Sequence, residues 1–221
     1  MATLQDLQNS ARKLAQLRQD DSNSFPISTD RLHPLGLPIK AHFHRLFAVK
    51  KHSATHLHYD LRLELNGVMK SWALTTGPSY YPGDASQAIQ MPDHSKENID
   101  FEGLIPEPRY GAGIIMQWDC GVWAPQSEYL DVDAALRNGY LGLNLDGSKL
   151  KGNWELIRIK NDEQKPVWIF IKAADSYARS AQGKSILDEA PNSVLSGKSL
   201  KEIKWDWNNP KSEDNLVPTL F

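Results

Sequence analysis

The sequence contains very little cysteine and no long hydrophobic run. Its 221 residues include one Cys, which excludes an internal disulfide framework and a multi-cysteine zinc site. The longest apolar runs, such as Val167-Trp-Ile-Phe-Ile171, are too short to span a bilayer. The N-terminus lacks the basic segment and apolar core of a secretory signal. We therefore expect a cytoplasmic protein, or a nuclear one in a eukaryote, with no membrane contact.

Several common catalytic motifs are also missing. The sequence contains no Gly-x-x-x-x-Gly-Lys-[Ser/Thr], no Gly-x-Gly-x-x-Gly and no His-Glu-x-x-His. Cys120 has no obvious base beside it, which argues against a cysteine nucleophile. These absences disfavour P-loop nucleotide hydrolases, dinucleotide-dependent enzymes and zincin-type proteases.

The charge is nearly balanced overall but unevenly distributed. Between Lys40 and Lys70, six Lys and Arg face two acids, a balance of +4, and five of the seven His lie in the same stretch. Between Asp84 and Glu107, six acids face one Lys, a balance of −5. A basic, His-rich strip in a nearly neutral chain favours a local anionic ligand over a surface that coats DNA. Two solvated faces of opposite sign are the alternative.

Hydrophobic patterning predicts a mainly β protein, a closed or nearly closed barrel of about eight strands. The expected strands lie at 46–51, 57–65, 68–74, 87–91, 112–118, 140–145, 150–159 and 166–172. Asn66-Gly67 and Asp146-Gly147 each predict a hairpin, and a short internal helix is expected from Asp133 to Asn138, ended by Gly139. Five tryptophans are expected to pack in the core: Trp72, Trp118, Trp123, Trp154 and Trp168.

The barrel is expected to occupy residues 45–204 as a single domain. Before it, residues 1–44 predict a peripheral helix over 4–17 and an extended connector over 19–39. After it, residues 205–221 read as a C-terminal tail. The sequence does not specify an oligomeric state, and we take a monomer as the default.

The stretch from Lys50 to Glu64 carries the residues that favour chemistry. If 57–65 is a strand, five polar side chains share one face: His56, His58, Asp60, Arg62 and Glu64. His58 and Asp60 can then point at one ion, and His52 can supply a third ligand. Imidazole and carboxylate without thiolate suit Mn²⁺, Fe²⁺, Co²⁺ or Zn²⁺. Three protein ligands leave positions open for water or a phosphate oxygen, as in a catalytic site. Half-buried histidines satisfied by hydrogen bonds are the alternative.

Two more side chains complete this candidate site. Arg62 lies on the same predicted face, close enough to the ion to bind a phosphate. His94 follows Asp93 in a loop-like segment, where a surface role and a catalytic role are both consistent with the sequence.

The segment from Phe47 to Gly67 closely resembles the signature of the 3′-phosphoesterase module of bacterial DNA ligase D and its stand-alone relatives. Similar motifs follow in order up to about residue 204, among them Lys70-Ser-Trp-Ala, Asp93-His94, Tyr110-Gly-Ala-Gly113, Trp118-Asp-Cys-Gly-Val-Trp123 and Trp168-Ile-Phe-Ile-Lys172. The resemblance implies a compact β-barrel with a Mn²⁺-dependent activity. Such enzymes remove a terminal ribonucleoside from a DNA 3′ end and then the remaining 3′-phosphate.

The resemblance also implies roles for particular residues. The family's metal ligands fall on His52, His58 and Asp60, its phosphate-contacting Arg on Arg62 and its active-site His on His94. We expect the ion and Arg62 to neutralise charge on the phosphate, while His94 stabilises the transition state or protonates the leaving oxygen. Mn²⁺ is the expected cofactor, with Co²⁺ or Zn²⁺ as alternatives.

Further substrate contacts are expected from Lys50 and His56. The implied partners are DNA or RNA-tipped DNA 3′ ends. Any ligase or polymerase that joins those ends is expected to act in trans.

Four positions depart from the family pattern. Thr76 stands where a Lys is usual, Ser86 where a basic residue is usual, Lys50 where a Gln is usual and Asn98 where a Tyr is usual. Two functions are therefore considered. The first is a phosphoesterase with an altered substrate range, and the alternative is a catalytically weakened barrel that still binds metal and DNA 3′ ends.

Overall fold

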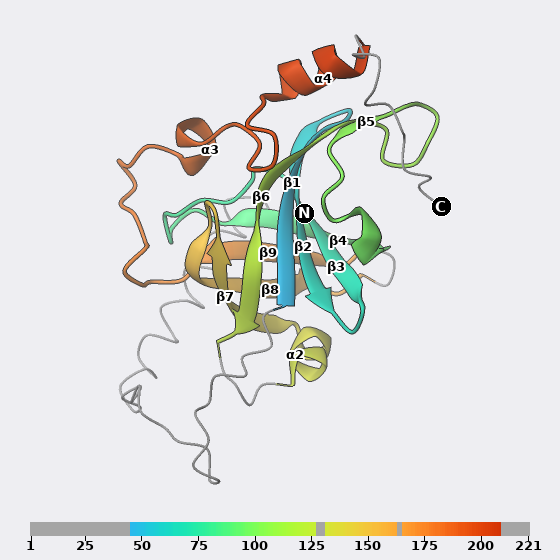
Figure 1. The fold of residues 1–221 in the computed structure, drawn as a ribbon. Coiled ribbons are helices and arrows are strands. Elements are labelled where there is room, and N and C mark those ends of the chain that lie inside the picture. Colours follow the sequence, from blue (N-terminus) through green and yellow to red (C-terminus); the bar gives the residue numbers. More distant parts are fainter. Residues whose placement is uncertain (1–44, 127–130, 163–164, 209–221) are drawn as a thin grey trace, which may run out of the picture. The chain divides into compact units, whose positions relative to one another are not determined.

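The computed structural model describes residues 45–126, 131–162 and 165–208, which form a sheet of nine strands with short helices around it (Figure 1). The strands are β1 (Arg45–Ser53), β2 (Leu57–Leu65), β3 (Val68–Leu74), β4 (Ser86–His94), β5 (Gly103–Ile105), β6 (Gly113–Pro125), β7 (Tyr140–Gly147), β8 (Lys151–Lys160) and β9 (Val167–Lys172). The helix and connector predicted over 4–17 and 19–39 lie outside the described residues.

The sheet closes on itself. Its strands follow the order β1-β2-β3-β4-β9-β8-β7-β6, and β6 pairs again with β1 in antiparallel register. These eight strands form the barrel, while β5 pairs with the start of β6 at Gly113–Ile115. In Figure 1, β1, β2 and β6 stand upright at the front, and β8 and β9 cross behind them. The mainly β barrel predicted from the sequence is confirmed.

Both predicted hairpins exist, but the second turns later than expected. Asn66 and Gly67 have φ angles of 53° and 83°, so both adopt the left-handed conformation that a tight two-residue turn requires. Asp146, in contrast, still pairs with Lys151, and the chain turns only after Gly147. A side chain at Gly147 would approach Asp119 Oδ2 to 2.6 Å, so this glycine provides space between strands and does not form the turn.

The barrel interior is filled by side chains. Alternate residues of β2 point inward and are buried: Tyr59, Leu61, Leu63 and Leu65. All five tryptophans expected in the core are at most 1% exposed, as predicted. Each buried aromatic side chain removes about 150–250 Å² from water, so these residues stabilise the barrel and leave little room for a ligand inside it. A ligand site has to lie on the outer face.

The outer face of β1 and β2 is covered by the connection from β4 to β6. This connection includes the short helix η2 (Lys96–Asn98) and β5. An ion pair between Lys96 and Glu64 attaches η2 to β2, and Lys50 Nζ donates a hydrogen bond of 2.8 Å to the Phe101 carbonyl. Because of this cover, outward-pointing Arg62 is only 7% exposed.

Within the described ranges, three α-helices flank the barrel, with α2 at one end and α3 and α4 at the other (Figure 1). Helix α2 (Val132–Asn138) ends at Gly139, whose φ is 83°, which confirms the predicted short helix. Helices α3 (Ile186–Glu189) and α4 (Leu200–Asn208) were not predicted. Helix α4 buries Ile203 and continues past residue 204, where the tail was expected to begin. No helix in the described ranges is long and apolar enough to cross a membrane.

Candidate metal centre

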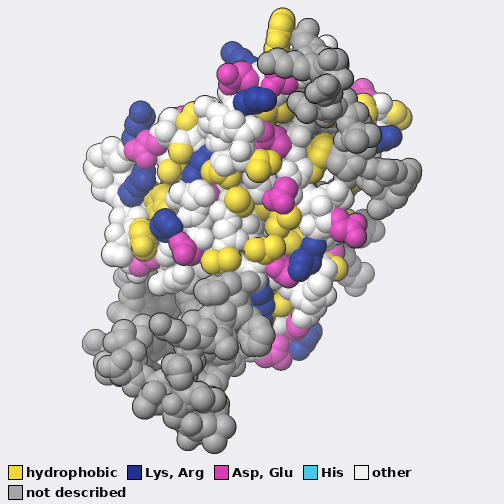
Figure 2. Space-filling view, in the orientation of Figure 1, with side chains coloured by type: hydrophobic (Ala, Val, Ile, Leu, Met, Phe, Trp, Pro, Cys, Tyr) yellow, Lys and Arg dark blue, Asp and Glu magenta, His cyan; other side chains and the backbone are white. Residues whose placement is uncertain are grey.

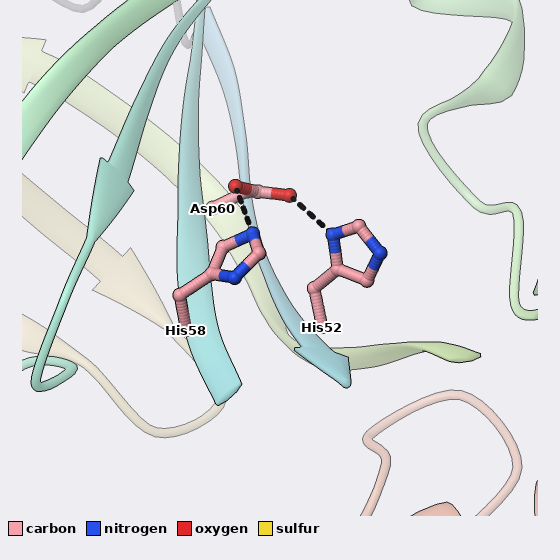
Figure 3. A group of neighbouring side chains, drawn as sticks. All are labelled: His52, His58 and Asp60. Carbon is pink, nitrogen blue, oxygen red and sulfur yellow. Dashed lines mark ion pairs between the residues drawn. The ribbon is translucent and has the colours of Figure 1, made fainter. Parts of the chain in front are cut away.

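Three side chains converge on the outer face, where β1 ends and β2 begins. The antiparallel register places His52 directly opposite His58, and Asp60 follows two residues later on the same face of β2. His52 Nδ1 lies 3.6 Å from Asp60 Oδ2, and His58 Nε2 lies 3.4 Å from Asp60 Oδ1 (Figure 3). One potential ligand atom from each residue lies within 4.8 Å of the other two. The hairpin between β1 and β2 therefore assembles the trio that strand spacing predicted.

The geometry of this trio fits a divalent ion. Two ligands bonded at about 2.0–2.2 Å to one ion lie about 3.0–3.6 Å apart, and both histidine–Asp60 distances fall in this range. His58 Nδ1 lies 3.0 Å from the His56 carbonyl. A proton on Nδ1 would be donated to that carbonyl and would leave the Nε2 lone pair facing Asp60, as in many metal-binding histidines. The described residues can therefore hold an ion of the class that prefers nitrogen and oxygen ligands.

The electrostatic environment keeps Asp60 ionised. Burial by itself would raise the pKa of this carboxyl, but hydrogen bonds from His52 and His58, together with the charges of His58 and Arg62, hold its pKa well below the ordinary range. The same hydrogen bond to Asp60 raises the pKa of His58. A carboxylate that stays charged at neutral pH is the form that binds a cation.

Two buried basic side chains lie next to the trio. Arg62 is 7% exposed, and its Nε has no hydrogen-bond partner among the described residues. Lys50 is 1% exposed, and burial, reinforced by the charge of Arg62, lowers the pKa of its ammonium to about 7. Because buried donors are normally hydrogen-bonded, the unpaired Arg62 Nε is suited to an anionic ligand.

His94 reaches the same place from the end of β4. Its Nδ1 lies 2.9 Å from the Ser71 hydroxyl on β3. Burial and the charge of Arg62 lower the pKa of the His94 imidazole. The ring is therefore neutral near physiological pH.

The predicted residues line one cavity of about 730 Å³. Six of them contribute to its wall: Lys50, His52, His58, Asp60, Arg62 and His94. His56 does not line it and is exposed; its contact with the site is the backbone carbonyl near His58. The remaining wall comes largely from residues after β4 that strand spacing did not identify, including Asn98, Phe101, Glu107 and Tyr110. Tyr110 could have been identified in the sequence from the motif Tyr110-Gly-Ala-Gly113.

A glycine allows the wall to approach the metal ligands closely. At Gly113, where β6 begins, φ is 137°, and a Cβ atom would lie 2.5 Å from the Ser53 carbonyl and 3.0 Å from His52 Nε2. Only glycine fits this position without displacing β1.

Two of the four residues that depart from the family pattern, Thr76 and Ser86, contact each other. Thr76 Oγ1 and Ser86 Oγ are 3.1 Å apart, and neither residue contributes to the cavity wall. Lys50 and Asn98, the other two departures, do line it. The cavity therefore combines the predicted metal trio with wall residues that differ from the family pattern.

The visible surface and the cavity differ in how their positive charges are arranged. On the face shown in Figure 2, the described Lys and Arg side chains are interspersed with Asp and Glu and form no continuous basic area. Arg62 and Lys50, in contrast, are both nearly buried beside the metal trio. This distribution is suited to one phosphate group held locally.

The comparisons with known proteins agree on one family. The profile of the DNA Ligase D 3′-phosphoesterase domain matches residues 50–158. The chain is 44% identical over 154 residues to the multifunctional non-homologous end joining protein LigD of Pseudomonas aeruginosa, covering 70% of this chain and 18% of that protein. It is 37% identical over 119 residues to the corresponding DNA repair protein of Mycobacterium tuberculosis, covering 52% of this chain and 15% of the relative. The Mycolicibacterium smegmatis LigD is 30% identical over 168 residues, which are 72% of this chain and 21% of the relative. The chain thus spans about a fifth of the length of these relatives.

Proposed function

Because residues 50–158 belong to the DNA ligase D 3′-phosphoesterase domain family, we propose that this chain is a Mn²⁺-dependent phosphoesterase that processes DNA 3′ ends. Its proposed substrates are strands that end in a single ribonucleotide or in a 3′-phosphate. The observation that carries the proposal is the meeting of three potential metal ligands, two buried cations and His94 at one cavity. A DNA ligase or polymerase acting in trans would use the cleaned 3′ end.

We assign the metal to His52, His58 and Asp60. A bound divalent ion supplies a Lewis acid for a phosphate oxygen, and three protein ligands leave positions open for that oxygen. The low pKa of Asp60 keeps its carboxylate available to the cation. The His56 carbonyl orients the His58 ring and holds its Nδ1 proton away from the metal.

Arg62 and Lys50 bind the phosphate. The guanidinium of Arg62 offers an unpaired Nε–H to a phosphate oxygen, and the planar fork of this side chain is suited to bidentate contact. Lys50 Nζ uses one of its hydrogen bonds on the Phe101 carbonyl and retains others for the substrate. Each charge-assisted hydrogen bond contributes about 1.5–3 kcal/mol in a desolvated site.

The size of the cavity is consistent with a small terminal group. Sites for small ligands are commonly about 300–1,000 Å³, and this cavity of about 730 Å³ lies within that range. His94 faces the cavity from β4, where it can transfer a proton at an oxygen of the phosphate.

The decisive experiment uses purified protein and a labelled primer–template. The primer ends in one ribonucleotide or in a 3′-phosphate, Mn²⁺ is titrated, and His58→Ala serves as the metal-site variant. Cleavage of either end that depends on Mn²⁺ and is lost in His58→Ala would support the proposal. Undiminished cleavage in that variant would contradict the metal assignment.

The second candidate function is a metal- and 3′-end-binding barrel with little turnover. The neutral pair Thr76 and Ser86, at positions where the family pattern has basic residues, favours it. Mn²⁺ binding to the wild type and retention of the labelled primer, with no cleavage of either end, would identify this function.

A further inference from the structure

The register between β3 and β4 changes immediately before His94. Ser71 pairs with Met91, but Met69, two residues earlier, pairs with His94, three residues later. Strand β4 therefore carries one extra residue in this interval, which is a β-bulge. The bulge contains Pro92, which has no N–H to donate to a neighbouring strand and is well suited to such an interruption.

The bulge places the His94 ring against Ser71. The Ser71 hydroxyl lies 2.9 Å from His94 Nδ1 and 3.3 Å from the Met69 carbonyl, in a direction that allows it to donate to that carbonyl. Ser71 is only 2% exposed, so water does not compete freely for this hydroxyl.

Counting protons links the tautomer of His94 to the direction of the Ser71 hydroxyl. A serine hydroxyl has one proton and two lone pairs, and a carbonyl can only accept. When Ser71 donates its proton to the Met69 carbonyl, it can only accept at His94, so the ring proton lies on Nδ1. A neutral ring with its proton on Nδ1 has a bare lone pair on Nε2.

We propose that Ser71 is a positioning residue that holds His94 as the Nδ1–H tautomer and makes Nε2 a proton acceptor at the cavity. The catalytic consequence rests on the proposed function. As a water oxygen bonds to phosphorus and the bond from phosphorus to the leaving oxygen breaks, Nε2 takes one proton from that water. The leaving oxygen takes a proton from solvent, and the His94 ring later releases its added proton to solvent. This assignment differs from the expectation that neutral His94 protonates the leaving oxygen, because this tautomer has no Nε2 proton to give.

Two ion pairs on either side of His94 fix the bulge. Lys70 on β3 binds Asp93 at 2.7 Å, and Lys96 on η2 binds Glu64 on β2. The segment from Asp93 to Lys96 is therefore attached to β3 by one ion pair and to β2 by the other. These contacts keep the ring beside Ser71 and restrict its rotation.

The tautomer can be measured without substrate or metal. Long-range ¹H–¹⁵N correlation spectra of the ¹⁵N-histidine-labelled full chain, recorded above the pKa of His94, distinguish Nδ1–H from Nε2–H, and His94→Gln assigns the signals. We expect Nδ1–H in the wild type, a shift toward Nε2–H in Ser71→Ala, and recovery of Nδ1–H in Ser71→Thr, which keeps the hydroxyl. The control Ser86→Ala removes a buried serine hydroxyl that lies on β4, and it is expected to leave the tautomer of His94 unchanged. Nε2–H in the wild type, or no change in Ser71→Ala, would overturn the proposal.

Kinetics test the consequence for catalysis. In the primer–template assay we expect Ser71→Ala to lower kcat about 10- to 100-fold, as partners that orient histidines do, and to change KM and Mn²⁺ affinity less than about twofold. Ser71→Thr should recover most of kcat. Full kcat in Ser71→Ala would overturn the catalytic role. If the spectra agree but the wild type cleaves neither end, the proposed function fails while the tautomer assignment stands.

Discussion

His52 and His58 face each other across the β1–β2 hairpin, with ring centroids 4.7 Å apart and planes tilted by 57°. Both rings also lie against Asp60, at 3.6 and 3.4 Å. A shift of one residue in this register would move His58 and Asp60 to the interior face, because strand side chains alternate. The metal site is thus a consequence of the β1–β2 register, which the short connection over residues 54–56 and the buried leucines of β2 determine.

Removing the charge of Asp60 tests the site directly. In Asp60→Asn the amide keeps the shape of the side chain but is a poor ligand, so Mn²⁺ affinity should fall at least about 100-fold, beyond the usual effect of a residue that only orients ligands. Isothermal titration calorimetry measures the affinity, and circular dichroism verifies the fold. The matched control Asp133→Asn lies on α2, away from the trio, and should bind Mn²⁺ like the wild type. Equal affinities in the two variants would refute the assignment.

The close approach of β6 to His52 should make Gly113 sensitive to substitution. An added methyl in Gly113→Ala meets the Ser53 carbonyl at 2.5 Å, at a φ of 137° that other residues rarely adopt. We expect the free energy of unfolding to fall by at least about 2 kcal/mol, together with weaker Mn²⁺ binding, because His52 is displaced. Gly197→Ala is the control: its φ is 74° but no atom lies within 4 Å of the added carbon, so only about 1–2 kcal/mol of backbone strain is expected. Urea unfolding compares the two, and an equal loss of stability would show that the contact is unimportant.

Local patterns in the sequence predicted most of the barrel but not the wall of the cavity. Strands β2 and β3 could be predicted to the residue, because alternation and the Asn66-Gly67 turn are local signals. Strand β5 has three residues, too few for any alternation to show, and is defined by its pairing with β6. The β6 strand extends to Pro125 through Cys120 and Gly121, where the apolar pattern lapses, because β1 and β7 supply its hydrogen-bond partners.

The difference between local signals and long-range contacts also explains which site residues could be predicted from the sequence. His58, Asp60 and Arg62 lie two residues apart on one strand, so their common face could be predicted, and His52 lies one hairpin away. The contact between Ser71 and His94 joins residues 23 positions apart and depends on a bulge. Pro92 was the one local signal for that bulge. The remaining residues of the cavity wall are positioned by long-range packing, which the periodicity of the sequence does not encode.

A buried ion pair on the opposite side of the barrel should make stability depend on pH. Asp175 accepts hydrogen bonds from Lys172 Nζ and from the backbone N–H groups of Asn153 and Tyr177. Burial alone would raise the pKa of the Asp175 carboxyl, but the Lys172 ammonium and the two N–H groups outweigh it and lower this pKa. The contribution to stability is therefore complete above the unfolded pKa of about 3.9 and is lost as pH falls through the lower folded value.

Asp175→Asn should lower the free energy of unfolding at pH 7 by about 3 kcal/mol, because it leaves the fully buried Lys172 ammonium without its counter-ion. The difference from the wild type should begin to shrink below about pH 4, where the unfolded chain binds a proton at this carboxyl, and should disappear only below the lower folded pKa. Urea unfolding at both pH values measures it. Asp146→Asn breaks the Lys151 pair, in which Asp146 is 69% exposed, and should change stability little at either pH. A constant difference between wild type and Asp175→Asn across this range would contradict the role of the charge.

Tyr110 should contribute to substrate binding but not to the chemical step. It lines the cavity, yet its side chain is 76% exposed, so the ring stands at the cavity rim. An exposed aromatic ring beside a phosphate site can stack on a nucleobase, and such stacking contributes about 1–3 kcal/mol. We therefore expect Tyr110→Ala to raise KM about 10-fold or more in the primer–template assay, with kcat nearly unchanged, and Tyr110→Phe to behave like the wild type.

The control for this prediction is Tyr177→Ala. Tyr177 is 49% exposed but does not line the cavity, so its removal should leave KM unchanged. If Tyr110→Ala lowered kcat and left KM unchanged, the ring would act on the reacting groups and not on the base. If neither parameter changed, the terminal nucleotide would have to enter the cavity from a side that Tyr110 does not border. A raised KM, a lowered kcat and no change in Tyr110→Ala would each correspond to a different orientation of the substrate. Only stacking at the rim agrees with an exposed ring at a cavity that also contains buried Arg62 and Lys50.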